Sequence, residues 1–125
     1  SIGIGEISFE SDSIVTSDGE AFRLSGKNFD SIGKKRLCIA TPWADFDHSI
    51  ELNTRFADEF VSSLTARQAR VLYHGLLFSK SQKDMAEELG MTRQNFNYHW
   101  RASKGQLIAD YLEYFQSLIS KYIPQ

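Results

Sequence analysis

The segment from Gln82 to Arg101 places a small residue, a glycine and a hydroxyl residue at a spacing that favours two helices joined by a tight turn. Ala86 would let a second helix cross the first closely, and Gly90 readily adopts the positive φ that such a turn requires. Thr92 is suited to cap the second helix, which we expect from about Arg93 to Ser103. The space between the two helices would be filled by four apolar side chains, those of Met85, Leu89, Met91 and Phe96.

The two sides of the predicted second helix differ in their chemistry. Phe96 and Trp100 are one turn apart and share a side, which we expect to face inward. The other side carries Arg93, Gln94 and Asn97. Arg can donate two hydrogen bonds to guanine, and Asn or Gln can pair with adenine, so we predict that these three residues read bases in a major groove. Contacts with the DNA backbone are predicted for Ser81, Gln82, Lys83, Thr92, Tyr98, Arg101 and Lys104.

A second motif lies upstream, since LTARQARVL at residues 64–72 precedes DMAEELGMT at residues 84–92. Together they resemble region 4 of bacterial sigma factors and the LuxR-type response regulators, whose DNA-binding unit begins with a Leu-Thr-x-Arg-Gln-x-x-Val-Leu helix. The resemblance covers residues 64–107. It implies a helix-turn-helix in which Thr65 and Ser81 cap the first two helices and residues 92–101 form the recognition helix. Phe96 and Trp100 depart from both families, in which smaller aliphatic residues are usual, so no operator sequence is carried over.

Charge is distributed unevenly along this chain of net charge -2. Residues 64–104 hold seven Lys or Arg against three acidic side chains, whereas residues 1–63 hold eleven acidic against six basic ones. The acidic side chains therefore lie outside the predicted DNA-binding segment. Because few phosphates could be neutralised per subunit, we expect modest non-specific DNA binding that weakens as salt rises.

The N-terminal third contains short β-prone runs separated by turn residues. These runs predict strands at residues 2–10, 13–16, 20–24 and 36–41. Asp18–Gly19, between Ile14–Val15 and Ala21–Phe22, indicates a hairpin, and residues 25–33 are expected to form a longer loop. We therefore predict a small antiparallel sheet, of roughly three or four strands, within residues 1–48.

The segment WADFDH at residues 43–48 brings two carboxylates beside His48, at Asp45 and Asp47. Such groups can bind a metal, but a single loop with no second cluster is a weak signal, and we predict neither a metal nor a cofactor. Trp43 and Phe46 instead suggest a turn whose aromatic rings cover the junction between sheet and helices.

No sequence pattern here indicates an enzyme, because a glycine-rich phosphate loop and a nucleophile with a partnered base are both missing. The single Cys38 excludes an internal disulfide and fits a reducing cytoplasm. The sequence contains no apparent membrane span. We expect a cytoplasmic, nucleoid-associated protein.

Two further helices are expected on either side of the DNA-binding segment. Apolar residues recur at helical spacing from Ser49 to Ser62, which predicts a connecting helix. Gly105 disfavours one continuous helix and indicates a kink or a break. Beyond it, a wide apolar stripe predicts a helix that either folds back on the sheet or pairs with its copy in a homodimer, and we favour the dimer. The stripe consists of Leu107, Ile108, Tyr111, Leu112, Phe115, Leu118, Ile119 and Tyr122.

The sequence thus predicts an α+β protein with an N-terminal sheet module (1–48), a connecting helix (49–63), a helix-turn-helix unit (64–104) and a C-terminal dimerisation helix (105–123). The function that fits best is sequence-specific binding of double-stranded DNA by a dimeric transcriptional regulator reading an inverted repeat, with RNA polymerase as a further partner if it activates. The alternative is a protein-interaction module, such as a polymerase adaptor or an anti-activator, that uses the same helices without touching DNA. A small enzyme acting on DNA is a third reading, and no acid cluster or nucleophile in the sequence supports it.

Overall fold

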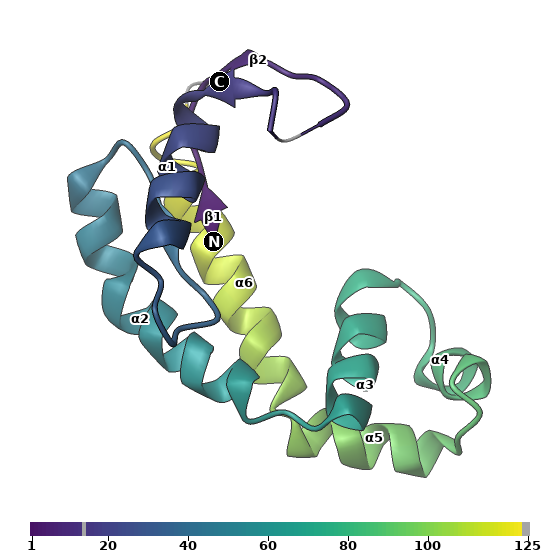
Figure 1. Ribbon diagram of the computed structural model, residues 1–125. Helices are drawn as coiled ribbons and strands as arrows, with labels where there is room; N and C mark the ends of the chain where they lie inside the picture. The colour runs from purple at the N-terminus through teal and green to yellow at the C-terminus, as the bar shows by residue number, and fades with distance from the viewer. Residues whose placement is uncertain (14, 124–125) are drawn as a thin grey trace. The chain divides into compact units, whose positions relative to one another are not determined.

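The computed structural model describes residues 1–13 and 15–123 and divides into two compact units, Ser1–Ser63 and Leu64–Gln125 (Figure 1). Its fold class is mixed α+β, as the sequence predicted, with short strands and two helices in the described part of the first unit and helices in the second. Ile14, which the predicted strand 13–16 and the predicted hairpin both include, lies outside the described residues.

The strands of the first unit form two separate pairs. β1 (Ile2–Gly3) pairs in parallel with β4 (Ile39–Ala40), and β2 (Ile7–Phe9) pairs antiparallel with β3 (Asp18–Gly19). The prediction of one antiparallel sheet is therefore wrong, although β2 and β3 do form an antiparallel pair. β3 is the Asp18–Gly19 pair that was predicted as a turn, and residues 13, 15 and 16 of the predicted strand 13–16 are not in a strand. A parallel pair requires a long crossover connection. Nothing in residues 36–41 themselves indicates that they pair with a strand as distant in the sequence as β1.

Residues 20–24 were predicted as a strand and residues 25–33 as a loop, and both predictions are wrong. Helix α1 (Glu20–Asp30) occupies most of this stretch. Its half-buried side chains follow the helical spacing, at Ala21, Phe22, Leu24, Ser25 and Asn28. The Asp18–Gly19 pair, which resembles a hairpin turn in the sequence, is itself strand β3.

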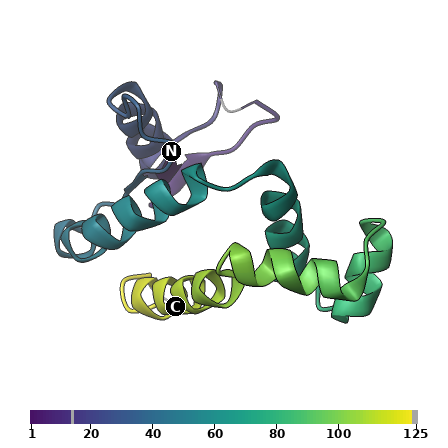
Figure 2. The same ribbon diagram turned by 90° about the horizontal axis from the view of Figure 1, so that it is seen from below.

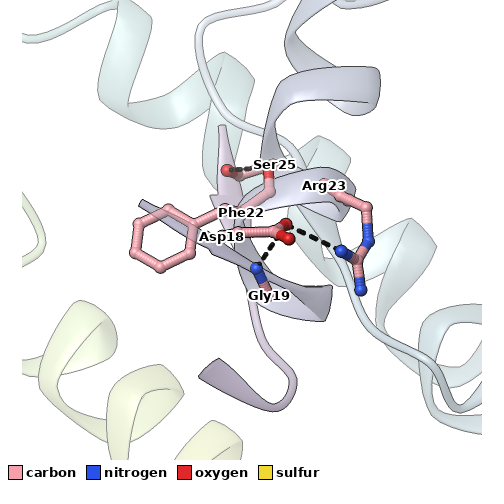
Figure 3. A network of polar contacts seen from close by, with 5 residues as sticks. All are labelled: Asp18, Gly19, Phe22, Arg23 and Ser25. Atoms are coloured by element: carbon pink, nitrogen blue, oxygen red, sulfur yellow. Dashed lines mark hydrogen bonds and ion pairs between the residues drawn. The ribbon is translucent and has the colours of Figure 1, made fainter. Parts of the chain in front are cut away.

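Polar contacts at the start of α1 join it to β3 (Figure 3). The Asp18 carboxylate accepts hydrogen bonds from the Gly19 N–H and from the Arg23 guanidinium, both at 2.7 Å. One turn later the Ser25 hydroxyl donates to the Phe22 carbonyl at 3.1 Å. Because Asp18 and Arg23 are both exposed, their ion pair contributes little to stability, and it orients the first turn of α1.

Helix α2 (Ala44–Ser62) begins five residues before the predicted Ser49, so residues 44–48 of the WADFDH segment are helical, Trp43 is the N-cap, and the predicted turn is wrong. Phe46, Ile50, Thr54 and Ala57 recur at helical spacing and are buried, and Phe46 is fully so. Asp58, also on the buried side, accepts hydrogen bonds from the N–H groups of Arg36 and Leu37 at 2.9 and 2.7 Å. This carboxylate holds the segment that leads into β4.

The second unit contains four helices among its described residues: α3 (Ala66–Leu77), α4 (Gln82–Glu88), α5 (Arg93–Ala102) and α6 (Gly105–Ile119). Figures 1 and 2 show α3, α4 and α5 gathered together, with α6 following from the end of α5. The core of this unit is made of Val71, Met85, Ala86 and Phe96, with Leu89, Met91 and Trp100 packed against it.

Candidate nucleic-acid interface

Each of the three helices α3, α4 and α5 begins at the hydroxyl residue that the sequence predicted as its cap. The Thr65 hydroxyl accepts from the Gln68 N–H at 3.2 Å, and the Gln68 side chain accepts from the Thr65 N–H at 2.9 Å, which completes a capping box. The Ser81 hydroxyl accepts from Asp84 and the Thr92 hydroxyl from Asn95, both at 3.1 Å. Helix boundaries in this segment are therefore specified by local hydrogen bonds.

The turn between α4 and α5 depends on Gly90, which has a φ of 66°. Two hydrogen bonds close the end of α4: the Gly90 N–H donates to the Glu87 carbonyl at 3.0 Å, and the Met91 N–H donates to the Ala86 carbonyl at 2.9 Å. This pattern is the Schellman motif, in which a residue in the left-handed conformation ends a helix. The predicted roles of Ala86 and Gly90 at a tight turn are confirmed.

The inward side of α5 is defined by Phe96 and Trp100. Phe96 is 0% exposed and packs with Val71 of α3 and Met85 of α4. The indole of Trp100 lies against Gly75 of α3 and Gly105 at the beginning of α6, where there is no space for larger side chains. The orientation of α5 about its own axis is therefore determined by apolar packing, and the polar side chains opposite Phe96 are directed outward.

Most of the residues predicted to contact DNA are exposed. Arg93 and Gln94 are exposed and Asn97 is half-buried, all on α5. Of the seven predicted backbone contacts, Gln82 is half-buried and the other six are exposed. Ser81, Gln82 and Lys83 form the beginning of α4, whereas Thr92, Tyr98 and Arg101 belong to α5 or its cap, and Lys104 follows α5.

Lys104 has a left-handed backbone with a φ of 53°, and Ser103 before it is fully buried. The chain breaks its helix here, so the break that Gly105 indicated in the sequence is confirmed, with α6 beginning at Gly105 itself. His99 on α5 is half-buried, and its Nδ1 atom is buried.

Cations on this surface remain unneutralised. Among residues 1–13 and 15–123, no ion pair involves Lys83, Arg93, Arg101 or Lys104. Lys80 differs, because its ammonium pairs with Glu88, and a nitrogen of His74 lies 3.8 Å from the same carboxylate. The four unpaired cations are available to an anionic partner.

Two further arginines of the basic segment, Arg67 and Arg70, lie close to the beginning of α5. The sequence predicted no role for them. Arg67 and Arg70 line a cleft of about 650 Å³ together with Thr92 and Asn95. Their spacing of three residues places them on one side of α3. This spacing is visible in the sequence and could have predicted that they act together. Their closeness to α5 depends on how the helices pack.

Comparison with protein-family models, with curated proteins and with solved structures found no match to this chain. The resemblance to sigma region 4 and to LuxR-type regulators therefore remains a prediction from the motif. No helix in the described part of the chain combines the length and the apolar character needed to cross a membrane. Asp45, Asp47 and His48 fall on α2, and the described residues contain no group of three or more His, Cys, Asp or Glu side chains placed to hold a metal.

The predicted dimerisation residues lie along α6, apart from Tyr122, which follows it. Leu107 and Leu112 are 64% and 48% exposed, and Ile119 is buried. The remaining members of the stripe are half-buried, namely Ile108, Tyr111, Phe115, Leu118 and Tyr122.

Proposed function

We propose that this chain is a sequence-specific, double-stranded DNA-binding transcriptional regulator that acts as a homodimer. The observation that carries the proposal is the orientation of α5: Gln94 is exposed opposite the fully buried Phe96, Arg93 is exposed in the first turn, and Asn97 is half-buried on a flank. Base recognition requires such a rigid presentation, because a bidentate contact tolerates little error in position.

The mechanism follows from the chemistry of these side chains. The first turns of α5 enter the major groove, where the Arg93 guanidinium can donate to O6 and N7 of guanine and the side-chain amides of Gln94 and Asn97 can pair with adenine. Lys83, Arg101 and Lys104 neutralise phosphates on either side. Binding to a promoter would either block polymerase or recruit it, and both outcomes use the same interface.

A homodimer agrees with the apolar stripe of α6, which keeps Leu107 and Leu112 exposed in the single chain. Two copies related by a two-fold axis would place two α5 helices in successive major grooves, about 34 Å apart. Sedimentation of Leu112→Glu tests this point: the variant should be a monomer with half the apparent mass, whereas Gln116→Glu, an exposed control on the same helix, should remain a dimer. A monomeric parent protein would refute the dimer.

The experiment that tests the function is selection of bound fragments from a random duplex pool, followed by binding measured over a range of salt. We expect an enriched inverted repeat and an affinity for random duplex that falls steeply as salt rises, because phosphate contacts release counterions. Failure of the intact protein to retain any duplex at low salt would refute DNA binding.

A second candidate function is the protein-interaction module, which is favoured by an exposed apolar cluster at the end of α3. Tyr73 and Leu77 are 57% and 62% exposed, and the Tyr73 ring lies edge-on to Phe78 with 5.9 Å between centroids. Such a patch suits a protein partner. An adaptor of this kind would bind polymerase or an activator and would show no duplex binding at any salt concentration, which the same salt titration detects.

A further inference from the structure

A cleft lies between α3 and the α4–α5 turn, and the sequence predicted no role for it. It has a volume of about 650 Å³, and its polar lining comes from Arg67 and Arg70 on α3 and from Thr92 and Asn95 at the start of α5. Both arginines are exposed, and in the described chain neither belongs to an ion pair. Among the described residues, two arginines without an ion-pair partner therefore line one concave surface.

The cleft lies at one edge of the proposed reading surface. Successive residues of a helix are about 100° apart, so Asn95 and Asn97 are on nearly opposite flanks of α5, with Gln94 and Tyr98 between them on the outer side. Because Asn95 lines the cleft, Arg67 and Arg70 stand beside that flank. An α5 helix seated in a groove has a phosphate strand along each flank, and one strand would pass this edge.

We propose that Arg67 and Arg70 bind the phosphodiester backbone of duplex DNA along this flank of α5. The inference rests on the proposed function and adds two phosphate-binding residues to it. A guanidinium group matches a phosphate well because its planar N–H donors can contact two phosphate oxygens at once. The Thr92 hydroxyl already accepts from Asn95, yet its own proton remains free to donate to a phosphate oxygen.

An acidic peptide is the other anion that two arginines could hold, and the lining of the cleft favours DNA over it. The apolar residues of the cleft, Leu89 and Met91, are half-buried because they pack against the core, so they offer little surface to an apolar peptide side chain. Glu87 also lines the cleft and reduces its net positive charge, so the cleft alone would hold a short acidic peptide weakly, whereas DNA would also contact the cations of α4 and α5. Thr92 and Asn95 place the cleft next to one flank of α5. A DNA strand would run along this flank, whereas a short peptide could bind in the cleft without contacting α5 further.

The test compares the parent protein with Arg67→Ala/Arg70→Ala on the selected operator and on random duplex, over a range of salt. Each lost phosphate contact should make the slope of log K against log salt less negative by about 0.9. We expect the double variant to lose between about one and two units of slope and to bind both duplexes more weakly by the same factor, since phosphate contacts carry no sequence information.

Three controls complete the experiment. Lys27→Ala/Lys121→Ala removes two exposed cations elsewhere and should leave the slope unchanged. Arg67→Lys/Arg70→Lys keeps both charges and should restore most of the slope. Thermal melting of each variant, followed by circular dichroism, confirms that the helices remain folded.

The outcomes separate the two proposals. An operator affinity and slope equal to those of the parent protein would overturn the role of Arg67 and Arg70 while leaving the proposed function intact. Loss of binding to a fluorescent poly-glutamate peptide, with duplex binding unchanged, would overturn it in favour of a peptide site. A parent protein that binds no duplex overturns both proposals.

Discussion

The indole of Trp100 lies so close to Gly105 that a Cβ atom at Gly105 would stand 2.3 Å from the ring. Gly75 lies against the same ring, where a Cβ would stand 2.4 Å from it. Real Cβ contacts are never so short, so the two glycines form the walls of a slot for Trp100. This slot joins α3, α5 and the beginning of α6, and it fixes the side of α5 that faces outward.

Gly105→Ala should destabilise the second unit by about 1–3 kcal/mol, because the added methyl group overpacks the slot. The measurement is urea unfolding followed by Trp100 fluorescence in a Trp43→Phe background, so that only the second unit is observed. Gln116→Ala, an exposed change on the same helix, is the control and should leave the midpoint nearly unchanged. An unchanged midpoint for Gly105→Ala would contradict the close packing.

Gly90→Ala should cost about 1–2 kcal/mol for a different reason. No atom lies within 4 Å of the missing Cβ, so the cost arises from placing an L residue in the left-handed conformation. Gly90→Asn should cost less, because asparagine tolerates this conformation better. Equal stabilities of the alanine and asparagine variants in urea unfolding would show that the turn does not retain its positive φ.

Thr92→Ala should lower the free energy of unfolding by about 1 kcal/mol through loss of the cap of α5. Thr92→Ser keeps the hydroxyl that accepts from Asn95 and should retain most of the stability. The comparison uses the same urea assay, and a serine variant as unstable as the alanine variant would assign the effect to the lost methyl group instead.

Arg93→Ala and Asn97→Ala should each weaken operator binding by about 1–3 kcal/mol and relax base preference at one position. Gel-shift titrations on the selected operator and on its single-base variants provide the measurement. Gln106→Ala, an exposed polar change on α6, is the control and should leave affinity unaltered. Unaltered operator affinity in both test variants would disprove the assignment of the reading surface.

Lys104 offers a way to separate charge from conformation. Lys104→Ala and Lys104→Gly both remove a cation, so both should weaken binding to all duplexes alike and reduce the salt slope by about 0.9. The glycine variant should be more stable than the alanine variant by about 1 kcal/mol, because residue 104 is left-handed. A more stable alanine variant would mean that this backbone conformation is not maintained in solution.

Much of the candidate site was predictable because its caps and its turn are formed by interactions between residues within segments of four to six residues. Thr65, Ser81 and Thr92 cap their helices through side chains that reach backbone groups three residues away, and Gly90 ends α4 through bonds within one turn. The inward placement of Phe96 and Trp100 followed from helical periodicity. In each case the interaction lies within a single turn of chain, so its residues are visible side by side in the sequence.

The first unit was harder to predict, because its elements depend on partners far away in the chain. Asp18 and Gly19 resemble a hairpin turn and yet form strand β3, since Ile7 and Phe9 pair with them and α1 packs behind. Ile2 pairs with Ile39 in parallel across an intervening helix. A short β-prone run becomes a strand or a helix depending on the elements that pack against it. The periodicity of its own sequence does not identify those elements.

The amino-acid sequence by itself determined where α3, α4 and α5 begin, their caps and the turn at Gly90, because short-range hydrogen bonds and steric limits on the backbone act within a few residues. The C-terminal helix, predicted over residues 105–123, ends earlier, at Ile119. Tertiary structure alone decided that residues 20–30 are helical, that two glycines enclose Trp100, and that Arg67 and Arg70 come to stand beside Asn95. Those relationships arise from packing between segments distant in the chain, where the burial of apolar surface outweighs local preference.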